Sequence, residues 1–82
     1  MAAVIETSLD LAATVRATRR ELGLTQDDLA LASGTGRRFI VDLEAGKETV
    51  RLDAVLAVLT ALGLRVELHR GRAREADRRA DS

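Results

Sequence analysis

Apolar residues recur at helical spacing in four stretches of the chain, and glycines stand between these stretches. In the first stretch, the apolar residues that share one helix face are Leu9, Ala12, Val15 and Leu22. Residues 7–10 (Thr-Ser-Leu-Asp) offer capping hydroxyls followed by an acid at the start of this stretch. Gly23 can adopt the left-handed conformation that ends a helix. The pattern predicts a first helix from about residue 8 to residue 22.

Two shorter helices separated by a glycine turn are predicted next. Thr25 and Asp28 form a pair like a capping box at the start of the second helix. Its inner face carries Leu29, Ala30 and Ser33. Residues 34–36 (Gly-Thr-Gly) break the pattern, and helical spacing resumes at Arg37 and ends at Gly46. The inner stripe of this third helix consists of Ile40, Leu43 and Glu44.

A fourth helix is predicted over residues 52–62, with Gly63 ending it. Its apolar stripe consists of Leu52, Val55, Leu56, Leu59 and Leu62. Residues 64–69 then alternate apolar and polar positions, which is typical of a half-buried strand. Residues 70–82 hold eight charges and no large apolar side chain, so we expect a flexible, solvated tail. The chain therefore divides into an all-α domain over residues 8–63, a strand over residues 64–69 and a tail.

The predicted strand finds no second strand in this chain to pair with. Backbone donors and acceptors need partners, and an isolated ribbon is unstable in water. If two copies pair antiparallel about Val66, Arg65 of one copy faces Glu67 of the other. Leu64 then faces Leu68, and each such pair contributes roughly 0.2–1 kcal/mol. We therefore expect a homodimer, the alternative being that residues 64–69 continue as an extended tail over the core.

Composition limits the classes of function. Eighty-two residues suffice for one small domain, and its single aromatic residue, Phe39, leaves aliphatic side chains to fill the core, so a large enclosed active site is not expected. Cysteine is absent and His69 is the only histidine, which excludes disulfides, thiolate chemistry and Cys/His zinc sites. No nucleophile with a neighbouring base is visible. We predict a protein that is not an enzyme and needs neither cofactor nor metal.

Charge and hydropathy bear on partners and location. No apolar run approaches the roughly 20 residues of a membrane span, so we expect a cytoplasmic protein without a membrane partner. The 13 basic residues balance 13 acidic ones, so net charge gives no argument for nucleic-acid binding. Any such argument must come from where the charges sit.

Two charged residues occupy positions where apolar ones are expected. Arg19 falls on the stripe of the first helix between Val15 and Leu22, and Glu44 falls four residues after Ile40. An unpaired buried charge destabilises a fold, so we expect Arg19 and Glu44 to form a structural ion pair across the core. The alternative is that both side chains turn to solvent at the edge of the domain.

Residues 19–30 (RRELGLTQDDLA), Gly34 and residues 40–47 (IVDLEAGK) together resemble the helix-turn-helix proteins of the XRE and Cro type. The resemblance covers about residues 10–63 and implies a lambda-repressor-like fold that binds DNA. Such families also pair a buried arginine with a glutamate. This sequence departs from the pattern at Ser33 and Thr35, where apolar residues are usual, and at Gly36, which stands at the cap of the recognition helix.

In this motif the first helix of the pair crosses the phosphate backbone, and the first residues of the second enter the major groove. An arginine fork can bind guanine O6 and N7 together, a carboxylate can accept from cytosine, and an apolar side chain can meet a thymine methyl. The candidates for base readout are Arg37, Arg38, Phe39, Val41 and Asp42. Phosphate contact alone remains open for the arginines, a solvated face for Asp42, and packing on the domain for Phe39. The candidates for backbone contact are Thr25, Gln26, Gly36, Lys47 and Arg51.

Residues 36–40 (GRRFI) and residues 51–64, followed directly by a short strand, are similar to the HipB-type antitoxins. This resemblance implies a homodimer on palindromic operators of its own operon, a HipA-like serine/threonine kinase toxin as partner, and a tail open to proteolysis. Two alternatives remain. One is a stand-alone repressor without a toxin, and the other is a protein-interaction module with an apolar patch of Leu31, Phe39 and Val41.

Overall fold

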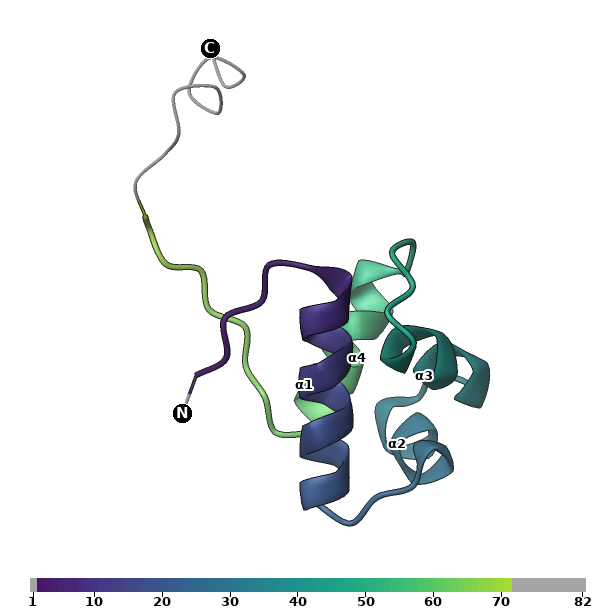
Figure 1. Ribbon diagram of the computed structural model, residues 1–82. Coiled ribbons are helices and arrows are strands. Elements are labelled where there is room, and N and C mark those ends of the chain that lie inside the picture. Colours follow the sequence, from purple (N-terminus) through teal and green to yellow (C-terminus); the bar gives the residue numbers. More distant parts are fainter. Residues whose placement is uncertain (1, 72–82) are drawn as a thin grey trace.

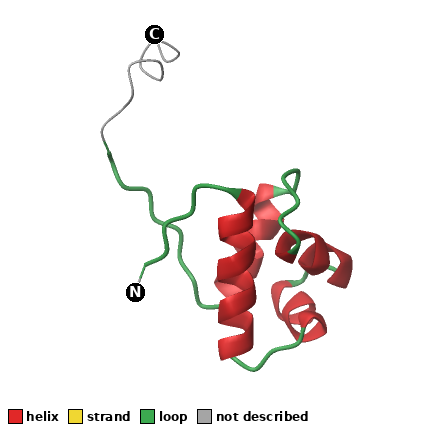
Figure 2. Ribbon diagram, in the orientation of Figure 1, coloured by secondary structure: helices red, strands yellow, loops and turns green. Residues whose placement is uncertain are grey.

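The computed structural model describes residues 2–71, and this part of the chain contains four helices (Figure 1). They are α1 (Ser8–Glu21), α2 (Gln26–Ser33), α3 (Arg37–Glu44) and α4 (Leu52–Ala61). The segments between and beyond them are loops (Figure 2). The predicted all-α fold is confirmed, and the predicted helix bounds hold to within a few residues.

Threonine–aspartate capping boxes begin α1 and α2. The Thr7 hydroxyl accepts from the Asp10 amide at 3.1 Å, and the Asp10 carboxylate accepts from the Thr7 amide at 3.1 Å. Thr25 and Asp28 make the same two bonds at 3.0 and 2.9 Å. Each box satisfies donors that the first turn of a helix leaves free, which explains where these helices start. Gly36 begins α3 without a side-chain cap bond.

The core forms where α2 packs against α3 and α4 while α1 packs against α3. The side chains with the least exposure come from all four helices and are Val15, Leu29, Ile40, Leu43 and Val58. Burying each of these aliphatic side chains stabilises the fold by about 1.5–3 kcal/mol. This core fixes α2 and α3 against each other.

The apolar stripes predicted at the helix ends are wrong in part. Leu9, Leu22 and Leu52 are 68%, 54% and 70% exposed, because they lie at the ends of short helices, beyond the reach of the core. Leu56 is 43% exposed, whereas Val58, outside the predicted stripe, is fully buried. The buried face of α4 follows i, i+3, i+4, i+7 spacing through Val55, Val58, Leu59 and Leu62.

Residues 64–71 carry neither helix nor strand in this single chain, and the segment leaves the helical body after α4 (Figure 1). Leu64 packs against the core, while Val66 and Leu68 are 54% and 95% exposed. The expected strand needs hydrogen bonds from a second copy, so its pairing stays a prediction. Of the predicted tail, residues 72–82 lie outside the described residues. Between residues 2 and 71, no helix is both long and apolar enough to cross a membrane.

Candidate nucleic-acid interface

α2 and α3 are joined by a turn of three residues, 34–36. Gly34 has φ +72°, a left-handed conformation that a residue with a Cβ rarely adopts, and it ends α2. The hydroxyls of Ser33 and Thr35 lie 2.9 Å apart, and Ser33 also donates to the carbonyl of Leu29 at 2.7 Å. The two polar residues that depart from the usual pattern therefore hydrogen-bond within the turn.

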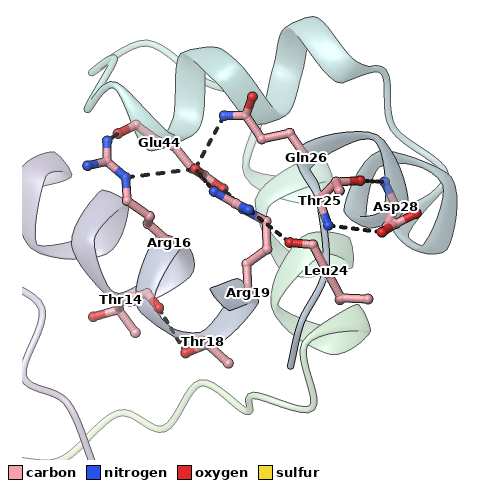
Figure 3. Close-up of polar contacts among 9 residues, drawn as sticks. All are labelled: Thr14, Arg16, Thr18, Arg19, Leu24, Thr25, Gln26, Asp28 and Glu44. Carbon is pink, nitrogen blue, oxygen red and sulfur yellow. Dashed lines mark hydrogen bonds and ion pairs between the residues drawn. The ribbon is translucent and has the colours of Figure 1, made fainter. Parts of the chain in front are cut away.

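Arg19 and Glu44 form a bidentate ion pair between α1 and the last turn of α3 (Figure 3). Arg19 Nε lies 2.7 Å from Oε2 of Glu44, and Nη2 lies 2.9 Å from Oε1. The Glu44 residue is 4% exposed. Arg19 Nη1 also donates to the carbonyl of Leu24 at 2.9 Å, so one guanidinium ties the end of α3 to the loop before α2.

Two further residues complete this polar network around Glu44 (Figure 3). Gln26 Nε2 donates to Glu44 Oε1 at 3.3 Å, and Arg16 Nη2 donates to the Glu44 carbonyl at 3.0 Å. Neither contact was predicted from the sequence. Arg16 stands three residues before Arg19 on the same face of α1, which is a signal for its role, whereas nothing in the sequence points Gln26 at a carboxylate.

The network sets the ionisation of its members. Burial acts to raise the pKa of the Glu44 carboxyl, but hydrogen bonds from Arg19 and Gln26 and the charges of Arg19 and Arg16 outweigh it and hold this pKa below its usual value. The hydrogen bond to Glu44 raises the pKa of Arg19. The pair is therefore fully charged at neutral pH and serves structure.

α3 presents a polar face to solvent and an apolar face to the core. Arg37 and Arg38 open the helix with side chains 65% and 87% exposed. The Asp42 side chain, one turn further along, is 23% exposed. Phe39 packs against the core, and Val41 is half-buried. Of the two alternatives for Phe39, base contact and packing on the domain, the structure favours packing on the domain.

The candidate contact residues gather in three places around α3. Thr25, Gln26 and Arg37 line one shallow depression at the start of α2. Gly36 and Arg51 line a second, beside Phe39. Lys47, after the end of α3, lies 3.7 Å from Asp42. The Thr25 hydroxyl already accepts its capping bond, and Gln26 already donates to Glu44, so each has a structural task beside any phosphate contact.

Catalytic or metal-binding geometry is not apparent in the part of the chain that the structure describes. Residues 2–71 hold no group of three histidine or carboxylate side chains that could bind a metal ion. The depressions beside α3 are shallow and open, and the arginines there are exposed. A long, convex partner that lies across α2 and α3 suits this surface better than a small enclosed ligand.

The chain is similar to known proteins over most of its length. The family model described as "Helix-turn-helix" matches residues 15–68. An uncharacterized HTH-type transcriptional regulator of Sinorhizobium fredii, y4mF, is 50% identical over 68 residues, which are 83% of this chain and 90% of that protein.

Among solved structures, the HipB–O4 20-mer complex is similar, with a TM-score of 0.76 and 25% identity over 84% of this chain and 97% of that one. The HipA–HipB–O2–O3 complex contains a chain that is similar with a TM-score of 0.77, at the same identity and coverage.

Proposed function

Because this chain belongs to the helix-turn-helix family of transcriptional regulators, we propose that it is a sequence-specific repressor and the HipB-like antitoxin of a toxin–antitoxin operon. The observation that carries the DNA-binding part is the exposed pair Arg37 and Arg38 at the start of a helix that α2 and the core hold rigidly. A helix presented in this way fits the major groove. Because its target is DNA, we expect the protein in the cytoplasm.

Base recognition is assigned to the first turn of α3. Each arginine has a guanidinium that can bind one guanine edge with two hydrogen bonds, and each good contact discriminates against a wrong base by about 1–3 kcal/mol. Asp42 and Val41 follow on the same helix as further candidates. Thr25, Gln26, Gly36, Lys47 and Arg51 are proposed as contacts to phosphates on either side.

The DNA-binding proposal is tested by titrating fluorescent duplexes at several salt concentrations. The operator is selected from a random duplex pool with the wild-type protein, and a random duplex serves as the comparison. We expect tighter binding to the selected operator and a slope of about −0.9 in log K against log salt for each phosphate contacted. Arg37→Ala should lower the preference for the operator, whereas Lys47→Ala should weaken both duplexes alike. Equal affinity of wild-type protein for the two duplexes contradicts sequence-specific binding.

A homodimer on a palindromic operator is part of the proposal. Residues 64–68 of two copies would pair as antiparallel strands, and the exposed Val66 and Leu68 would then gain apolar contacts. Two copies related by a two-fold axis read two half-sites about 34 Å apart. Selected operators should therefore be inverted repeats with one helical turn between the centres of their halves.

The antitoxin role is supported by the likeness to a chain in a HipA–HipB–DNA complex. The proposed partner is a HipA-like serine/threonine kinase. The test is co-expression with a kinase gene next to the gene for this chain, followed by purification through a tag on the kinase. We expect this chain to copurify and to inhibit the kinase, and Arg37→Ala to do both while losing operator preference. Failure to bind the kinase favours a stand-alone repressor.

The protein-interaction alternative receives less support from the fold. It needs Leu31, Phe39 and Val41 to form one apolar surface patch. Leu31 is 86% exposed, but Phe39 packs against the core and Val41 is half-buried. The patch is thus reduced to one exposed leucine, and DNA remains the better supported partner.

A further inference from the structure

Three basic side chains on α3 and in the loop after it form ion pairs with two carboxylates of the same chain. Arg37 Nε lies 3.1 Å from Oδ1 of Asp27, which stands in the first turn of α2. Arg38 Nε lies 3.2 Å from Oδ1 of Asp42, and Lys47 Nζ lies 3.7 Å from Oδ2 of that carboxylate. Three cations that would approach DNA thus share two anions.

Apart from the favourable position of the Asp27 charge in the first turn of α2, the side-chain contacts of these two carboxylates are ion pairs with the cations beside α3. Asp28, the neighbour of Asp27, makes the capping bonds of α2, whereas the Asp27 side chain is 74% exposed and contacts Arg37. Asp42 contacts Arg38 and Lys47 from a helix whose inner face is filled by apolar side chains and Glu44. Ion pairs with such exposed members add little to stability. We therefore ask how these ion pairs affect the binding of DNA at this surface.

We propose that Asp27 and Asp42 are specificity-determining residues, which compete with DNA phosphates for Arg37, Arg38 and Lys47 and so suppress binding to random DNA. This inference rests on the proposed DNA-binding function. In this proposal the two carboxylates affect specificity indirectly, by holding the cations that contact DNA.

The physical reason lies in what an arginine gains on leaving its carboxylate. A phosphate attracts it by charge, as the carboxylate already does, and the freed carboxylate then faces the DNA backbone without a partner. The exchange therefore gains little on random DNA, where phosphate contacts supply essentially all of the affinity. A guanine edge offers two directed hydrogen bonds in addition, so the exchange is favourable where the bases match. Repulsion from all DNA combined with attraction to one sequence raises selectivity.

The whole-chain charge makes this local competition effective. With 13 basic and 13 acidic residues, the chain has no excess positive charge to hold it on DNA nonspecifically. The few cations beside α3 must supply that attraction. Arg37, Arg38 and Lys47 are paired with Asp27 or Asp42, and Arg51 is paired with Asp53. Removing one carboxylate therefore frees one or two of these few cations to contact phosphates.

The experiment measures affinity for the random duplex and for the selected operator with Asp27→Asn, Asp42→Asn and the double variant of the full chain. On random DNA we expect about a threefold to tenfold gain for each single variant at low salt. The slope of log K against log salt should steepen by up to about 0.9 for Asp27→Asn, which frees one cation, and by up to about 1.8 for Asp42→Asn, which frees two. Operator affinity should rise less or fall, so the ratio of the two affinities decreases.

Glu21→Gln is the matched control, because it removes one exposed carboxylate at the end of α1 that forms no ion pair with Arg37, Arg38 or Lys47. It should leave the salt slope unchanged, and thermal unfolding should show that all variants fold. If Asp27 and Asp42 acted only by stabilising the helices, the variants would lose stability without binding random DNA more tightly. If the wild-type protein prefers the operator but the variants keep the wild-type salt slope and the wild-type ratio of the two affinities, this inference is overturned and the proposed function stands. Wild-type protein that binds neither duplex overturns the proposed function together with it.

Discussion

Among single residues, Glu44 is the buried polar group on which the arrangement of α1, α2 and α3 depends. Its place was predictable because a charge stands in an otherwise apolar stripe, and the same holds for Arg19. The position of Arg16, three residues before Arg19, is a weaker signal of the same kind, whereas the contact of Gln26 was not predictable because it depends on how the helices cross. The Arg38–Asp42 pair has the i, i+4 spacing that a sequence shows, whereas Arg37–Asp27 joins two helices and needed the fold.

Arg19→Ala should lower the free energy of unfolding by about 3 kcal/mol or more, because it leaves the Glu44 carboxylate buried without its main partner. Urea titration followed by circular dichroism measures the loss. Arg20→Ala, on the exposed side of α1, is the control and should stay within about 0.5 kcal/mol of wild type. A loss of similar size in both variants speaks against a buried pair.

Acid should destabilise the fold through carboxyls whose pKa is lowered on folding. The pKa of Asp10 is lowered mainly by the amide of Glu6, that of Asp28 mainly by the amide of Thr25, and that of Glu44 by bonds that outweigh its burial. A group whose pKa is lower in the folded state stabilises it above the unfolded pKa and loses this effect as pH falls through the folded pKa.

Stability should therefore stay level from neutral pH to about 4.5, the ordinary pKa of a glutamate, and fall below that value. Thermal unfolding between pH 7 and pH 3 measures the profile. Glu44→Gln should reduce the slope of the acid limb, since it removes one of these groups. An unchanged acid limb in this variant shows that the carboxylate of Glu44 does not contribute to it.

Helices and turns were the most predictable elements, because their ends are encoded locally by capping threonines and by glycines. Burial at those ends was less predictable. Leu9 and Leu52 carry the right spacing for an inner stripe but extend past a core that only four short helices enclose. Periodicity indicates which face of a helix turns inward, and the packing of the neighbouring helices decides how far along that face burial extends.

The two glycines of the turn between α2 and α3 should respond in opposite directions. Gly34→Ala should destabilise the fold by about 1 kcal/mol, since its φ of +72° disfavours any residue with a Cβ although the space beside it is open. Gly36→Ser should stabilise the fold by a few tenths of a kcal/mol, because Gly36 has φ −91° and α3 has no side-chain cap. Urea midpoints measure both changes, and a stabilising Gly34→Ala contradicts the first.

At the scale of the whole molecule, the proposed dimer would bring two copies of α3 to the DNA instead of one. Alternation over residues 64–69 predicts a strand, but residues 2–71 contain no second strand that could pair with it. The segment leaves the helical body with Leu64 packed on the core and Leu68 almost fully exposed. The local pattern predicts a strand, and its proposed partner is the same segment of a second copy.

Val66→Pro should convert dimers into monomers, because proline removes a ladder donor at the centre of the proposed strand pair. Sedimentation equilibrium of wild-type and variant chains measures the mass, and operator affinity should fall together with it. Val66→Ile is the control, which keeps the donor and the strand preference. If the proline variant forms dimers as stable as those of the wild type, the contact between the two copies lies outside residues 64–68.

The ion pair that holds the last turn of α3 has a consequence at the other end of that helix. Glu44 ties the last turn of α3 to α1, whereas Arg37 and Arg38 lie in the first turn of the same helix. A small change in the tilt of α3 displaces both guanidinium groups together and shifts their alignment with the bases. Substitutions of Arg19 or Glu44 that still allow folding should therefore lower the preference for the operator, although neither residue is a proposed DNA contact.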